Sequence, residues 1–140
     1  RHADHATHDA ALLAFHQRVE SLNAEMLGAH QHCAGPGLLP IAPDVLEFAG
    51  SREAAALCGV GPATPDHTIY TKRLPCFVPV DRPSDPEAVK AALDAAVARF
   101  AADYTAYFEA HNREGATLQD ANPRVVVGSG LGMFATVAMA

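Results

Sequence analysis

The N-terminal part of the chain has the hydrophobic spacing of an amphipathic helix. Between residues 7 and 30, apolar side chains recur at alternating steps of three and four residues: Leu12, Phe15, Val19, Leu22 and Met26. This period lays them along one side of a helix, with polar groups such as His16 and Glu20 on the opposite side. Gly35-Pro36-Gly37 prevents the helix from continuing, so a loop is predicted to follow.

A second long helix is predicted from Pro86 to about His111. Asp85 is a strong N-cap, and proline follows it at the first helical position. Apolar and aromatic residues then hold the helical period: Val89, Leu93, Ala96, Phe100, Tyr104 and Tyr107. Because the aromatic residues share this spacing, we interpret them as core packing rather than as an aromatic ligand box.

Shorter elements are predicted between the two helices. A helical turn starts at Pro43 and runs to Phe48, and Ser51 is a candidate N-cap for a helix from Arg52 to Cys58. Gly59 stands where a left-handed cap would end that helix.

Strands are predicted where β-branched and aromatic residues gather. His67 to Thr71 and Cys76 to Val80 have this composition, and Pro75 and Pro79 place the second at a sheet edge or strand end. Arg124 to Val127 has the continuous apolar character of a strand buried on both faces. A glycine turn and a further helix are predicted after it.

This alternation predicts an α/β fold with helices packed on a layered, largely parallel sheet, whose strand order the sequence leaves open. We expect a single domain over residues 1–140: a helical lead-in over 1–34, loops and short helices over 35–66, and a strand–helix–strand–helix unit over 67–140. Because the chain opens on Arg1 and stops within an apolar run, we also expect it to be a fragment of a longer enzyme.

Composition narrows the function classes. A chain of 140 residues with 49% hydrophobic residues is large enough for one soluble core, and a net charge of −6 with scattered basic residues speaks against nucleic-acid binding. No apolar run approaches the about 20 residues that span a membrane. Cys33, Cys58 and Cys76 lie far apart, so we interpret them as free thiols of a cytoplasmic protein.

Polar and ionisable side chains are concentrated between residues 66 and 73. Asp66 and His67 are followed closely by Lys72 and Arg73. Cations with a hydrogen-bonding imidazole suit an anionic ligand such as a phosphorylated sugar, so His67, Lys72 and Arg73 are predicted binding residues. The alternative is that Asp66 caps a turn, His67 is a satisfied side chain and the two cations are solvated.

Two histidine clusters raise a metal hypothesis. His2, His5 and His8 repeat every three residues, and His30 and His32 precede Cys33. The first cluster is terminal and the second adjoins a predicted loop, whereas a zinc site needs a rigid frame. We therefore predict no metal ligand, although the sequence leaves open whether either cluster ever binds metal.

The glycine-rich segment from Gly128 to Gly132 formally fits the phosphate-cradling turn of a dinucleotide fold when read on to Ala135. That fold also requires an acidic residue after a second strand about 20 residues further on, which the chain does not contain. We instead predict a tight strand-to-helix turn whose amides approach an anion, which adds Gly128, Gly130 and Gly132 to the binding set.

Three segments in the same order carry a family resemblance that spans roughly residues 40 to 136. They are Pro43-Asp44-Val45-Leu46-Glu47-Phe48, the stretch from Ala63 to Pro75, and the stretch from Pro123 to Phe134. Together they resemble the later part of the class II aldolase region of bifunctional rhamnulose-1-phosphate aldolase/short-chain dehydrogenase (lactaldehyde dehydrogenase) proteins. The resemblance implies, for the parent protein, a divalent metal (usually zinc) held by histidines, a glutamate in acid/base catalysis, and NAD-linked oxidation of lactaldehyde.

The metal-binding and catalytic motifs of that family match no position of this chain, so no catalytic residue is predicted and the chain alone is not expected to cleave an aldol. The resemblance implies a segment of a cytoplasmic enzyme of rhamnose catabolism, a lyase and oxidoreductase, that lends binding groups to a sugar phosphate. Its partners would be the rest of the same enzyme or further copies of it. The alternatives are a non-catalytic structural or oligomerisation module and a small metal-binding protein.

Overall fold

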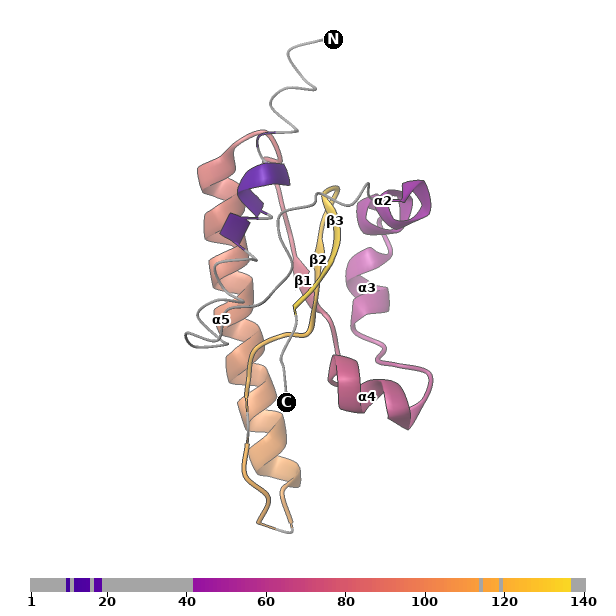
Figure 1. Ribbon diagram of the computed structural model, residues 1–140, viewed down its shortest axis with the longest axis vertical. Coiled ribbons are helices and arrows are strands. Elements are labelled where there is room, and N and C mark those ends of the chain that lie inside the picture. The colour runs from indigo at the N-terminus through magenta and orange to yellow at the C-terminus, as the bar shows by residue number, and fades with distance from the viewer. Residues whose placement is uncertain are drawn as a thin grey trace.

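The chain forms three layers, with a small sheet between helices. The computed structural model describes residues 10, 12–15, 17–18, 42–113, 115–118 and 120–136. Helix α5 (Pro86–His111) and the helical residues between 10 and 18 cover one face of the sheet, and α2 (Pro43–Gly50) with α3 (Ala54–Cys58) covers the other (Figure 1). The predicted α/β class is confirmed.

The sheet contains β1 (Cys76–Val78), β2 (Val125–Gly128) and β3 (Gly132–Ala135), in the order β1-β2-β3. β1 and β2 are parallel, whereas β2 and β3 are antiparallel. The prediction of a largely parallel sheet is therefore wrong, and the sheet is mixed. The parallel pair follows from the crossover through α5, and the antiparallel pair from a tight hairpin that returns the chain at once.

That hairpin replaces the helix predicted after the glycine-rich turn. Gly130 and Gly132 have φ angles of 70° and 119°, a region open mainly to glycine, and this lets the chain reverse within three residues. The amides of Ser129, Gly130 and Leu131 donate to backbone carbonyls. Among the three glycines predicted to bind an anion, Gly130 thus already donates its amide to the Ala49 carbonyl, and the binding roles of Gly128, Gly130 and Gly132 stay predictions.

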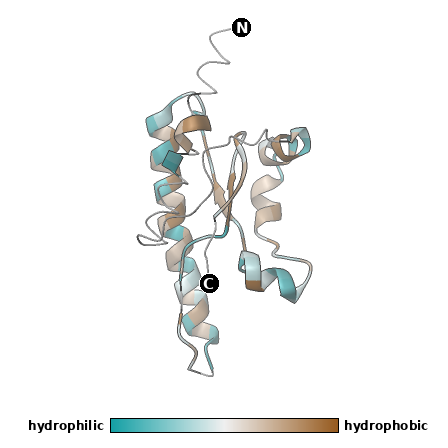
Figure 2. Cartoon of the chain, viewed as in Figure 1, coloured by the Kyte–Doolittle hydropathy of each residue, from teal (hydrophilic) through white to brown (hydrophobic). Residues whose placement is uncertain are grey.

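Helix α5 forms as predicted. The Asp85 side chain accepts hydrogen bonds from the amides of Glu87 and Ala88, which closes the first turn. The helix buries Val89, Leu93, Ala96 and Val97 against the sheet. Figure 2 shows the hydrophobic strands between the helices and hydrophilic residues on the outer side of α5.

Where the structure describes it, the N-terminal apolar stripe packs on the core of the same chain. Phe15 is fully buried, and its ring centroid lies 4.7 Å from that of Phe134 on β3. Arg18 pairs with Asp94 of α5 at 2.7 Å. The other predicted stripe positions Val19, Leu22 and Met26 lie outside the described residues.

Helices α2 and α3 differ from prediction mainly at their ends. α2 starts at Pro43 as predicted, but Ser51 ends it, donating its amide to the Phe48 carbonyl, instead of capping α3. α3 starts only at Ala54. Gly59 ends it with a φ of −84°, so the predicted left-handed cap is wrong.

Residues 67–71 are helical, although their composition predicts a strand. They belong to α4 (Pro65–Thr71), which has proline in its first turn and Asp66 beside the positive end of the helix. The Thr71 hydroxyl donates to the carbonyl of His67 at 2.8 Å. Because residues 62–70 are all exposed, their β-branched and aromatic side chains have no sheet to pack on, and strand propensity is decisive only where such a surface exists.

The strand prediction holds where the side chains are covered on both sides. Alternate residues of the sheet enter two clusters: Cys76, Val78 and Val126 pack toward α5, whereas Phe77 and Val127 pack toward α2 and α3. β1 is an edge strand, as its flanking prolines predict. No helix within the described ranges has the length and hydrophobicity that crossing a bilayer requires.

Cys58 and Cys76 are free and buried, as the cysteine spacing predicts, whereas Cys33 lies outside the described residues. Burial raises the pKa of Cys76 to about 11 and raises that of Cys58 as well. We expect iodoacetamide at neutral pH to leave both thiols largely unmodified in the native protein and to label both after unfolding in guanidinium, because the thiolate is the nucleophile. Peptide mapping would check this, and equal labelling of native and unfolded protein would contradict it.

Candidate functional site

The cations predicted from sequence lie where the chain passes from α4 to β1 alongside α5. The Lys72 Nζ atom is 4.0 Å from the centroid of the Tyr104 ring, and the Arg73 Cζ atom is 4.6 Å from that of Tyr107. Each contact is a cation–π pair. The core-packing interpretation holds for Phe100, which packs on the core, but it is wrong for Tyr107, whose side chain is 37% exposed.

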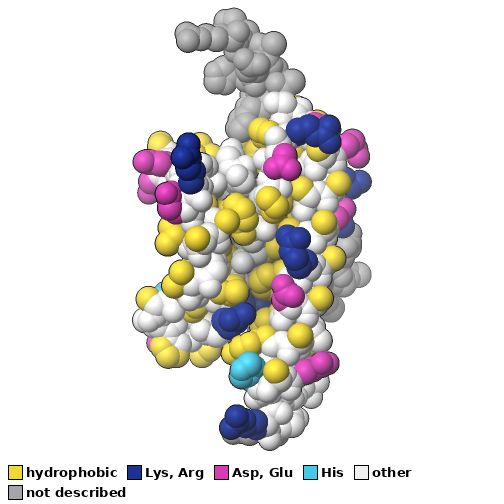
Figure 3. Space-filling model, turned by 180° about the vertical axis from the view of Figure 1, so that it is seen from behind, with side chains coloured by type: hydrophobic (Ala, Val, Ile, Leu, Met, Phe, Trp, Pro, Cys, Tyr) yellow, Lys and Arg dark blue, Asp and Glu magenta, His cyan; other side chains and the backbone are white. Residues whose placement is uncertain are grey.

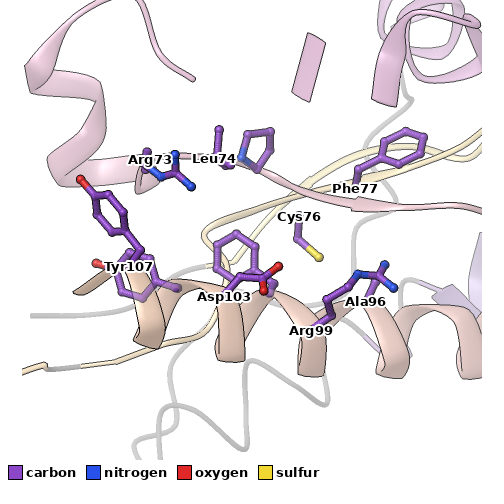
Figure 4. A pocket seen from close by; sticks show the side chains of 11 residues that line it. Arg73, Leu74, Cys76, Phe77, Ala96, Arg99, Asp103 and Tyr107 are labelled. Carbon is purple, nitrogen blue, oxygen red and sulfur yellow. The ribbon is translucent and has the colours of Figure 1, made fainter. Parts of the chain in front are cut away.

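Arg73 opens onto a pocket of about 270 Å³ between the segment before β1 and α5 (Figure 4). Arg99, Asp103 and Tyr107 line it from α5, and Cys76 lines it from β1. We call it the arginine pocket. Figure 4 shows Asp103 between Arg99 and Tyr107 along the helix, and Arg73 near Tyr107 on the facing segment.

The arginine pocket has an excess of positive charge. Two guanidinium groups face one carboxylate, and within the described part of the chain neither Arg73 nor Arg99 forms an ion pair. A guanidinium group can bind two oxygens of a carboxylate or phosphate at once through parallel N–H groups. The arrangement can therefore hold a small anion that also offers a hydroxyl group to Asp103.

The pocket belongs to a wider groove. Figure 3 shows a hollow between α2–α4 and α5 with hydrophobic side chains on its floor and Lys or Arg side chains along it. A second cavity of about 250 Å³, lined mainly by apolar residues that include Phe48, Leu57 and Met133, lies on the α2–α3 side of the sheet. Lys72 and Arg73 also reach the edge of this second cavity, whereas Arg99 and Asp103 line only the arginine pocket.

Lys72 does not share the arginine pocket. Its side chain is directed to the segment before β2, where Nζ donates a hydrogen bond to the carbonyl of Asp120. Arg124 Nη1 lies 2.6 Å from Asp120 Oδ2, an ion-pair distance, although its N–H groups are not aligned for a hydrogen bond. We call Lys72, Tyr104, Asp120 and Arg124 the lysine cluster.

Burial and charge shift both titratable partners of this cluster. Loss of hydration on burial lowers the pKa of Lys72 to about 8; the negative charge of Asp120 opposes this shift, and the positive charge of Arg124 adds to it. The pKa of Asp120 is lowered: burial raises it, but the Asn122 amide and the charges of Lys72 and Arg124 together outweigh that effect. The protonation state of each group therefore depends on the charge of the other.

His67 lies apart from both sites. It is exposed on α4, and its Nδ1 atom lies 2.7 Å from the Thr64 hydroxyl. It lines neither the arginine pocket nor the lysine cluster. The structure thus brings Arg73 to a pocket, buries Lys72 behind it and leaves His67 on the surface, while the binding roles of all three stay predictions.

Sequence reasoning missed Arg99, Asp103, Asp120 and Arg124. Arg99, Asp103 and Tyr107 are spaced by four residues on α5, so the helical period is the signal that could have placed them on a shared face. Asp120 and Arg124 precede β2 and lie outside regular structure, and no periodic pattern points to them. Their approach to Lys72 comes from the fold alone.

The described residues contain no candidate metal site. Nowhere among them do three or more histidine, cysteine, aspartate or glutamate side chains lie close enough together to hold an ion. The two histidine clusters that raised the metal hypothesis lie outside the described residues.

Comparison with known proteins places the chain in a family. The family model for the second domain of class II aldolases matches residues 13–140. The chain belongs to this family. It is also 37% identical over 95 residues to the uncharacterised oxidoreductase YuxG of Bacillus subtilis (strain 168), an alignment that covers 66% of this chain and 14% of that protein. No solved structure matches the chain.

The resemblance seen in the sequence is therefore confirmed at the level of the class II aldolase family. The relative is named as an oxidoreductase, and the finer prediction of a bifunctional rhamnulose-1-phosphate aldolase/short-chain dehydrogenase stays a prediction. The chain spans only 14% of the length of that relative, so the activity of a whole protein of this kind enters below as a proposal.

Proposed function

We propose that this class II aldolase second domain is a segment of a cytoplasmic, sugar-metabolising enzyme and binds the phosphate of a sugar phosphate beside a catalytic site carried elsewhere. The finer proposal is a bifunctional rhamnulose-1-phosphate aldolase/short-chain dehydrogenase acting in rhamnose catabolism. Family membership and the oxidoreductase relative support it.

One observation carries the binding role. Arg73 and Arg99 reach the same pocket from two different segments, and neither guanidinium is neutralised by an ion pair in the described part of the chain. Tyr107 holds Arg73 by its ring face and so limits the side-chain freedom lost on binding. A pair of guanidinium groups suits the oxygens of a phosphate, and Asp103 can accept a hydrogen bond from a sugar hydroxyl.

The zinc and NAD of such an enzyme would be held by other parts of the longer protein. The described residues offer no set of metal ligands, and the turn at Gly128–Gly132 is a hairpin rather than the strand-to-helix turn that cradles a dinucleotide. This segment would supply binding groups only. Its partners in this proposal are the sugar phosphate and the remaining domains or copies of the same enzyme.

Calorimetry with rhamnulose 1-phosphate tests the proposal. Arg73→Met keeps the apolar stem of the side chain and removes the charge, so we expect its affinity to fall by about tenfold or more, the usual effect of losing one charge-assisted contact. Arg82→Met is the matched control, because Arg82 is 74% exposed and pairs only with Asp85 at 3.6 Å among described residues. Equal affinities of the two variants, or equal binding of unphosphorylated rhamnulose, would contradict phosphate recognition.

A structural role is the second candidate, and exposed apolar side chains favour it. Leu57, Val60, Ile69 and Tyr70 are 53%, 77%, 77% and 77% exposed on or near α3 and α4. This surface could pack against another domain of a longer chain or a second copy. Light scattering of the wild-type chain and of Ile69→Ser would test self-association, and a monomer in both cases would remove the second copy as the occupant.

A further inference from the structure

Lys72 lines a third pocket, separate from the arginine pocket, whose walls include all four residues of the lysine cluster. This pocket has a volume of about 270 Å³ and is lined from α4, α5 and the segment before β2. Its polar lining includes Thr68, Tyr104, Thr117 and Asp120. A mostly polar pocket of this size accommodates a small hydrophilic molecule next to the amine.

The backbone of Lys72 is held in a conformation that side chains disfavour. Its φ of 62° and ψ of −179° lie in a region used almost only by glycine and strained for other residues. Such a conformation persists only where the surroundings hold it. Here the Asp120 carbonyl and the Tyr104 ring hold the side chain, while Lys72 itself is only 7% exposed.

The surroundings of the amine also favour its unprotonated form. Burial, with help from Arg124 and against Asp120, lowers its pKa to about 8 from 10.5, so the unprotonated share at neutral pH is about 300-fold larger than for a solvated lysine. One N–H suffices for the bond to the Asp120 carbonyl. A neutral amine can therefore keep that bond and still direct its lone pair elsewhere.

We propose that Lys72 is a nucleophilic amine that forms a reversible imine with a small hydroxyaldehyde bound in this pocket. The Nζ lone pair attacks the carbonyl carbon, and proton transfer gives a carbinolamine. The hydroxyl group leaves as water with a proton from nitrogen, so C=N replaces C=O and no oxidant or reductant is consumed. Desolvation and a neighbouring cation are the usual means of activating a lysine for this step.

The inference does not rest on the proposed sugar-phosphate site, because the two pockets have different polar groups apart from Tyr104. A purely structural lysine, which only ties the segment before β2 to α5, would show the same contacts but would be protected from reagents. Chemical reactivity therefore separates the two roles.

Reductive trapping with glycolaldehyde and cyanoborohydride tests this directly on the unmodified 140-residue chain. The chain has two lysines, Lys72 and the exposed Lys90 on α5, so Lys90 is an internal reference. At about pH 7 we expect peptide mapping to show Lys72 modified at least about tenfold faster than Lys90, since the larger unprotonated share outweighs restricted access. Lys72 reacting no faster than Lys90 would overturn the proposal.

The pH dependence gives a second, independent readout. Near about pH 10 a solvated lysine is also substantially unprotonated, so the ratio of the two rates should fall by about tenfold or more. The charged and titratable groups that face the Lys72 amine are Asp120, Arg124 and Tyr104. If the ratio of the two rates does not change with pH, a lowered pKa is not what activates Lys72, and the proposal is overturned. In Lys72→Arg the fast-reacting site should be absent while Lys90 reacts as before.

Discussion

Phe15→Ala is expected to lower the free energy of unfolding by about 3 to 5 kcal/mol, the usual cost of removing a buried phenylalanine ring. The ring is 0% exposed and packs on Phe134. It also fills the space above the β2–β3 turn, where a Cβ atom added to Gly128 would lie 3.2 Å from the Phe15 ring.

Leu13→Ala is the matched control, because Leu13 lies on the same helical segment but is 44% exposed. We expect it to cost less than about 1 kcal/mol. Denaturant unfolding followed by circular dichroism would measure both variants. If both cost the same, the segment around residue 15 would not pack on the sheet in solution, and the apolar stripe would again be free to bind a partner.

Asp120→Ala is expected to lower the free energy of unfolding by about 2 to 4 kcal/mol. The variant leaves Lys72 and Arg124 close together without a carboxylate, and removing one partner of a partly buried charge network costs far more than a surface pair is worth. Asp81→Ala is the control, since Asp81 is exposed and forms no ion pair among the described residues.

A double variant shows whether charge is the cause. Lys72→Met in the Asp120→Ala background removes one of the two uncompensated cations, so it should recover part of the lost stability. No recovery would mean that the loss comes from the altered segment before β2 rather than from electrostatics.

The same carboxylate should make stability depend on acid pH. The pKa of Asp120 is lowered in the folded state, so its contribution is present above the pKa of the unfolded chain, about 3.9, and is lost as the pH falls through the folded value. Wild-type protein should therefore lose stability below about pH 4 more steeply than Asp120→Ala. Parallel pH profiles for the two proteins would contradict this assignment.

The two pockets meet at Tyr104, which lines both and carries the Lys72 ammonium on its ring. Adjacent residues of one segment thus line different pockets: Arg73 lines the pocket proposed to bind phosphate, and Lys72 lines the pocket proposed to bind an aldehyde. Loss of phosphate affinity in Arg73→Met with unchanged trapping at Lys72 would show that the two sites act separately.

The sequence correctly predicted those helices and strands that are specified by residues close together in the chain. The Asp85 cap and a long helical period specify α5, and the apolar run before Gly128 specifies β2. The family resemblance rested on short motifs in a conserved order, and it proved correct at the level of the class II aldolase domain. The cations at 72 and 73 were also visible in the sequence, as was the edge position of β1.

What the sequence by itself determined is therefore the α/β class, the main helix, the buried strands and a cationic segment before β1. Only the tertiary structure decided that residues 67–71 form a helix, that β3 turns back antiparallel, and that Arg73 lines the arginine pocket whereas Lys72 lines the pocket of the lysine cluster. The reason is physical. Caps and periodicity act within a few residues, whereas strand pairing, burial and the approach of Arg99 and Asp120 depend on segments that are distant in sequence and meet only when the core forms.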